Sequence, residues 1–177
     1  VGYSQDCDPD AEYGYNCNCN EDTWESYYNS VDIDGGNASN MVGCYLPGAN
    51  LEGAHLFQAN LQGADLSGAS LSGANLALAN IDDANLFDAN LDFANLSGAY
   101  LAGAILILAD LSYASLSGAD LSGAYLQNAS LWNTTLYKAN LTGANLVGTY
   151  CYMANFIGAD LDGSNLDAAD LRYAYFD

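Results

Sequence analysis

The stretch ANLQGADLSGASLSG, residues 59–73, decides the fold of this chain of 177 residues. It contains three copies of a five-residue unit, each with alanine first, leucine third and glycine last. The same register continues without insertion from Ser39 to Asp177 and gives 28 units, the last of them one residue short. The central residue is leucine in 23 units and the first residue is alanine in 23. Such regularity within one chain excludes chance.

A period of five matches neither the 3.6-residue period of a helix nor the two-residue period of a strand. The chain must therefore turn once within each unit, so that the central residue and the small first residue face inward every time. Successive coils would lie about 4.8 Å apart and pair through backbone hydrogen bonds. Glycine in the last place of 14 units indicates a turn that benefits from freedom in φ.

The units ANLEG, ANLQG, ADLSG, ANLSG, ANLTG and ANLVG resemble the A(D/N)LxG consensus of the pentapeptide repeat proteins. This resemblance implies an all-β fold, a right-handed quadrilateral parallel β-helix with four units per coil, a solenoid of about seven coils. Residues 39–177 form the predicted β-helix. Residues 1–38 lie outside the repeat and are predicted to form a small N-terminal arm or cap rich in Cys, Asp and Tyr.

The charge balance is extreme, with 22 acidic residues against Lys138 and Arg172 and a formal net charge of −20. Such a surface repels nucleic acid and anionic membranes, so we expect no direct nucleic-acid binding. No run of 18 apolar residues occurs, so we expect no membrane insertion. The charge suits cationic partners or divalent ions, and the alternative is that it serves solubility alone.

Stacking every twentieth residue on one face predicts exposed apolar surface, which usually marks an interface. The alternative is ordinary filling of a β-type surface by Tyr, Ile and Phe. The predicted interface residues are Phe87, Phe93, Ile105, Ile107, Leu108, Tyr113, Trp132, Tyr152, Tyr173, Tyr175 and Phe176.

Catalytic signatures are absent from the sequence, and we expect no enzyme. The single histidine, His55, has no clustered partner, and no phosphate-binding loop, dinucleotide-binding glycine pattern or HExxH motif occurs. A core filled by leucine and alanine would also leave no pocket. We therefore assign no catalytic residue.

The N-terminal arm contains alternating carboxylates at Asp6, Asp8, Asp10 and Glu12, a pattern that suits a calcium ion with six to eight oxygen ligands. The glycine and the closing glutamate of an EF-hand are not in place. A solvated acidic loop is the alternative. Calcium is the one cofactor that the sequence suggests.

Three cysteines in the arm, Cys7, Cys17 and Cys19, are predicted to form one or two disulfides with one another or with Cys44. Small polar segments are often stapled in this way in oxidising compartments, and a zinc site is the rival interpretation. Cys151 replaces a central leucine and is predicted to be a buried free thiol. The cysteines, together with Val1 in place of Met, favour an exported, extracellular protein.

The repeat continues to Tyr175-Phe176-Asp177, so we expect an uncapped C-terminal coil that seeks a partner. The preferred hypothesis is a non-enzymatic structural protein, a rigid acidic rod that self-assembles end to end into filaments or pairs through this coil and its aromatic faces. Two alternatives remain open. One is a cytoplasmic DNA mimic acting on DNA gyrase, as the resemblance implies. The other is an extracellular, calcium-dependent binding scaffold.

Overall fold

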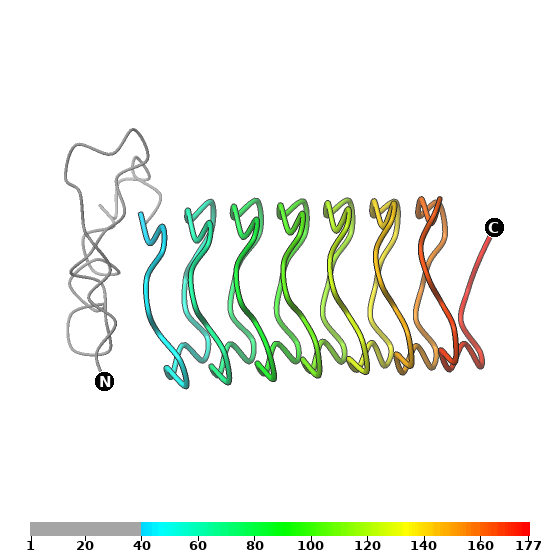
Figure 1. Ribbon diagram of the computed structural model, residues 1–177, viewed down its shortest axis with the longest axis horizontal. Helices are drawn as coiled ribbons and strands as arrows, with labels where there is room; N and C mark the ends of the chain where they lie inside the picture. Colours follow the sequence, from blue (N-terminus) through cyan, green and yellow to red (C-terminus); the bar gives the residue numbers. More distant parts are fainter. Residues whose placement is uncertain (1–39) are drawn as a thin grey trace.

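The computed structural model describes residues 40–177, which form a continuous coil advancing along one axis (Figure 1). Parallel bridges join the second residue of each unit to the residue twenty positions later, from Asn40 with Asn60 to Asn155 with Tyr175. Four units therefore complete one coil, as the resemblance implied.

The core of the coil consists of the first and central residues of each unit. From Met41 to Phe156 these side chains are at most 9% exposed, and most are completely buried. Leucine stacks on leucine and alanine on alanine in successive coils, which allows the dense packing typical of protein interiors. The first residue must be small because the tube is narrow.

Every unit turns in the same way. The carbonyl of the central residue accepts a hydrogen bond from the N–H three residues later, as in Ala64 N–H to Leu61 O at 3.0 Å. The fifth residue of the unit takes a positive φ, the requirement of a type II turn at its third position. Glycine meets this requirement in 14 units, whereas 13 units place another residue there.

Backbone hydrogen bonds join successive coils on all four sides. The N–H of Leu61 donates to the Asn80 carbonyl at 2.7 Å, and the N–H of Asp65 donates to the Cys44 carbonyl at 2.8 Å. The described residues nevertheless contain no strand, only single bridged residues. The expected all-β architecture is thus a ladder of isolated bridges, because the turn occupies the fourth and fifth residues of each unit.

Asn and Asp at the second position of the unit accept hydrogen bonds from the turn that follows. The Oδ1 of Asp110 accepts a hydrogen bond from the Ser112 N–H at 2.9 Å, and Asp160 accepts one from the Asp162 N–H at 3.0 Å. A side chain that bonds the backbone two residues later stabilises a turn locally. Much of the acidity of this chain therefore has a structural use.

The final turns of the coil are more open than the rest. The inward side chains of Leu161, Leu166, Leu171 and Ala174 are only partly buried. Within residues 40–177, no helix is long and apolar enough to cross a membrane. The predicted arm, residues 1–38, lies outside the described residues.

Candidate functional site

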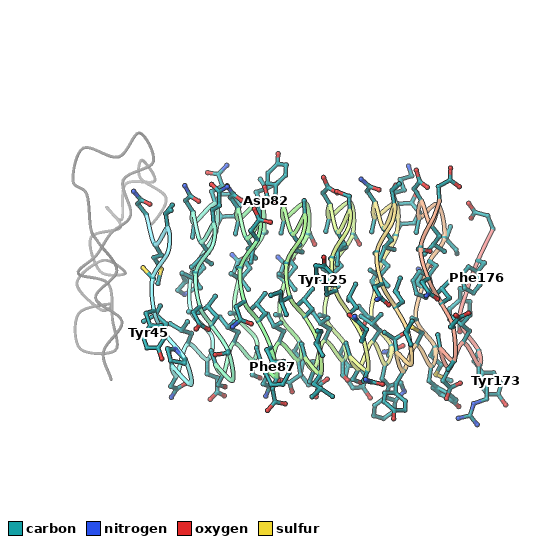
Figure 2. All side chains as sticks on the ribbon, viewed as in Figure 1. Tyr45, Asp82, Phe87, Tyr125, Tyr173 and Phe176 are labelled. Carbon is teal, nitrogen blue, oxygen red and sulfur yellow. The ribbon has the colours of Figure 1, made fainter. Side chains whose placement is uncertain are left out.

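The fourfold coil sorts the outward residues into four faces. We define each face by its first three outward residues together with every twentieth residue after each of them. The acidic face begins with residues 40, 42 and 43, and the mixed face begins with residues 45, 47 and 48. The aromatic face begins with residues 50, 52 and 53, and the acid-poor face begins with residues 55, 57 and 58. Figure 2 shows their side chains projecting from the rod, with Asp82 and Phe87 at opposite edges of the view.

The aromatic face brings together five of the predicted interface residues. The rings of Phe93 and Tyr113 stack with centroids 4.8 Å apart and an angle of 1° between their planes. Trp132 packs against Tyr113 at 5.3 Å, and Tyr152 meets Tyr173 edge to face at 5.1 Å. Four of these rings are exposed, with Phe93 at 61%, and Tyr152 is partly buried.

Several bulky residues of this face occupy the strained fifth position. The φ angles are 57° at Phe93, 60° at Tyr113, 59° at Met153 and 60° at Tyr173. A positive φ is uncommon for any residue with a Cβ and is an outlier for a bulky one. The sequence pattern signalled this only indirectly, through the missing glycines.

A cation already lies on the aromatic face. The guanidinium of Arg172 donates to both carboxylate oxygens of Asp170, at 2.8 and 2.7 Å, and lies over the Tyr152 ring at 6.0 Å from its centroid. The hydrogen bonds from Arg172 lower the pKa of Asp170 to about 2. Sequence reasoning did not find this contact.

The mixed face carries the apolar group predicted around residues 87–108. Phe87 and Leu108 are exposed, while Ile105 and Ile107 are partly buried. The run from Ala104 to Leu108 thus presents less apolar surface than its sequence suggests.

The acidic face holds the largest set of carboxylates. Its members are Asp82, Asp83, Asp120, Asp160 and Asp162. The Ala102 N–H donates to Asp82 at 2.8 Å. Burial raises the pKa of Asp82, the hydrogen bond from Ala102 opposes this rise, and the carboxylates of Asp120 and Asp83 add to it. The neighbouring Asp88 and Asp92 lie on other faces.

The acid-poor face has no Asp or Glu from residue 55 to residue 175. Its basic side chains over this range are His55 and Lys138, and the Lys138 amine lies 5.0 Å from the centroid of the Tyr137 ring. Exposed apolar side chains occur toward both ends of the face, namely Phe57, Leu78, Tyr137, Ile157 and Tyr175, whereas its middle coils carry Asn, Ser and Gly. The face ends at Asp177, whose carboxylate accepts a hydrogen bond from the Gly158 N–H at 3.0 Å. Phe176, the central residue of the last unit, stacks on buried Phe156 with centroids 5.1 Å apart. Of these residues, the sequence analysis found only Tyr175 and Phe176.

The predicted metal and disulfide residues fall largely outside the described part of the chain. Asp6, Asp8, Asp10, Glu12, Cys7, Cys17 and Cys19 all precede residue 40, so the calcium site stays a prediction. Within residues 40–177 no group of three or more His, Cys, Asp or Glu could hold a metal ion. Cys44 is fully buried and is not a free thiol. Its pairing with the arm and the exported location stay predictions.

Comparisons with known proteins identify the repeat. A family model for pentapeptide repeats matches eight copies over residues 37–73, 54–92, 84–123, 114–150 and 151–177. No curated protein matches the chain.

Several solved structures are similar. HetL, a pentapeptide repeat protein involved in heterocyst differentiation regulation in the cyanobacterium Nostoc sp. strain PCC 7120, is 31% identical, with 79% of this chain and 75% of HetL covered and a TM-score of 0.43. Rfr23 from the cyanobacterium Cyanothece 51142 is 28% identical, with coverages of 78% and 91% and a TM-score of 0.37. QnrB1, a plasmid-mediated fluoroquinolone resistance protein, is 18% identical, with coverages of 80% and 76% and a TM-score of 0.52, a likeness in fold alone.

Proposed function

Because the chain belongs to the pentapeptide repeat family, whose members form right-handed quadrilateral β-helices rather than catalytic folds, we propose that it is a non-enzymatic rod that pairs with a second copy of itself. The observation that carries this proposal is the acid-poor face. It has no Asp or Glu before Asp177 and carries five exposed apolar side chains, on a molecule with a net charge of −20.

Charge repulsion favours the acid-poor face as the contact between two copies. Two molecules with a net charge of −20 repel each other, and like charges placed opposite one another across an interface cost several kcal/mol. A contact through the acidic face would bring together the carboxylates of both copies. The acid-poor face lets two copies approach with the least repulsion while Phe57, Leu78 and Ile157 lose their contact with water.

Symmetry places one residue at the middle of such a contact. A two-fold interface uses the same surface on both copies, so a residue near its centre meets its own counterpart. Ser117 lies midway along the acid-poor face, between Phe57 and Phe176. A charge introduced there would be doubled at the interface. End-to-end stacking through the final coil is the other arrangement that the sequence predicts.

A matched pair of charge variants tests the proposal. Ser117→Asp adds a carboxylate to the acid-poor face, and Ser122→Asp adds one to the acidic face at the same place in the next unit. Sedimentation equilibrium should show a dimer for the wild type and for Ser122→Asp. For Ser117→Asp, the dissociation constant should rise by about tenfold or more, since opposed like charges cost several kcal/mol. A monomeric wild type, or equal effects of the two variants, contradicts the proposal.

The gyrase alternative fits this charge distribution less well. Duplex DNA presents phosphate charge along its whole length on both strands. Here the carboxylates are unevenly divided, with five on the acidic face and none on the acid-poor face from residue 55 to residue 175.

A further inference from the structure

We propose that the aromatic face is a docking surface for an arginine-rich segment of a partner protein. This face differs from the one proposed for self-pairing, so the two proposals stand or fall separately. Three observations lead to it: stacked and exposed aromatic residues, carboxylates placed beside them, and an arginine of the chain itself bound to a carboxylate and a ring.

The coil does not require the rings of this face. Gly53 and Gly73 occupy the same column with φ angles of 64° and 65°, and an added Cβ would meet nothing within 4 Å. The coil therefore runs through this position without a side chain. Phe93 and Tyr113 nevertheless stand there at positive φ, where residues other than glycine are strained. Because other residues take the same positive φ on all four faces, the stacked and exposed rings, rather than the strain, distinguish this column.

Carboxylates flank the exposed rings. Asp92 directly precedes Phe93, and one of its oxygens is shielded from solvent without a hydrogen-bond partner among the described residues. Asp110 is exposed and lies three residues before Tyr113. Aromatic rings beside carboxylates attract a cation through both the ring faces and the opposite charge. A planar guanidinium suits this pairing better than a compact ammonium group, because it stacks on rings and donates to both oxygens of a carboxylate.

Arg172 illustrates the binding mode within the chain. It donates to both oxygens of Asp170 and lies over the Tyr152 ring. Asp110 occupies the column of Asp170, sixty residues earlier. Each of the two carboxylates accepts a hydrogen bond from the backbone N–H two residues later. In that unit Ser112 stands where Arg172 stands later. The earlier unit has the carboxylate and the ring of Tyr113 but no arginine, and Asp92 takes the place that Tyr152 has beside Arg172. The guanidinium would therefore come from a partner.

Peptide binding tests this docking surface. Octa-arginine and octa-lysine peptides are titrated into the full chain by calorimetry at about 0.15 M salt, where charges farther apart than about 8 Å are largely screened. The wild type should bind octa-arginine about tenfold more tightly than octa-lysine, because guanidinium groups stack on the rings.

Variants locate the binding. Phe93→Gly combined with Tyr113→Gly keeps the residue that the turn prefers, so the fold should survive while the preference for arginine disappears. Asp110→Asn keeps the turn and should weaken octa-arginine binding severalfold. Asp160→Asn removes the same charge from an equivalent position on the acidic face, and Leu108→Gly removes a side chain from the mixed face; both should bind like the wild type.

Two results would overturn the proposal. Equal affinity for both peptides would indicate general attraction to an acidic rod. A preference for arginine that persists in the double glycine variant would place the binding elsewhere. Sedimentation of the same variants separates this outcome from a failure of self-pairing, because the acid-poor face is unchanged in them.

Discussion

At the scale of single residues, Cys151 shows how burial in the core changes the properties of a thiol. It takes the central position of its unit, is fully buried, and its sulfur lies 3.2 Å from the hydroxyl of Thr149. It is a free thiol, as the sequence predicted. Burial raises the pKa of Cys151 to about 11, against the smaller opposing effect of the Thr149 hydrogen bond.

This pKa predicts a specific loss of stability at high pH. The folded chain keeps the Cys151 proton up to a pH of about 11, whereas an unfolded thiol loses it near 9, its ordinary value. The unfolded state therefore binds fewer protons between these values, and the free energy of unfolding should fall by about 2–3 kcal/mol as pH rises through this window. Cys151→Ala should lack this part of the decline. Urea unfolding from pH 8 to about 11.5 measures both curves, and parallel curves would refute the expectation.

At the scale of the element, each five-residue unit depends on one positive φ. Gly123 has a φ of 64°, and a Cβ added there would meet nothing within 4 Å. Gly123→Ala therefore tests the backbone alone, and the left-handed conformation should cost about 1 kcal/mol. Gly123→Asn should cost less, since asparagine tolerates this conformation better. Urea unfolding measures both, and an alanine variant as stable as the wild type would show that the turn needs no glycine.

The conformation of the fifth residue was only partly predicted from the sequence. The repeat predicted a turn in every unit, and all 27 units from Gly43 to Tyr173 have the expected positive φ. It did not reveal that Phe93, Tyr113 and Tyr173 would adopt the glycine conformation instead of distorting the coil. The ladder of hydrogen bonds on both sides of each coil holds the backbone at a positive φ whether or not the residue is glycine. A residue with a Cβ at this position is therefore strained.

At the scale of the whole molecule, charge should act on the two proposed contacts in opposite directions. Raising the salt concentration from about 0.01 to 0.15 M shortens the screening length from about 30 to about 8 Å. Self-pairing should then tighten, because the repulsion between two acidic rods weakens. Binding of octa-arginine should loosen over the same range. Sedimentation and calorimetry across a salt series measure both trends, and a shared direction would contradict the division of roles between the two faces.

The sequence by itself determined the five-residue period, the inward leucine and alanine and the turn in every unit, and its resemblance to the pentapeptide repeat family supplied the stacking of residues twenty apart. These features repeat because a narrow core and a continuous ladder impose the same demand on each coil. The stacking of residues twenty apart also predicts the acid-poor face, because no Asp or Glu falls in its columns from residue 55 to residue 175.

Only the tertiary structure decided how the outward side chains lie. It stacked Phe93 on Tyr113, placed Arg172 over Tyr152 and left one oxygen of Asp92 without a partner among residues 40–177. It also partly buried Ile105 and Ile107, which the sequence presented as fully outward. The reason is physical: inward positions meet the same neighbours in every coil, whereas an outward side chain depends on residues about twenty positions away whose identity the repeat does not fix.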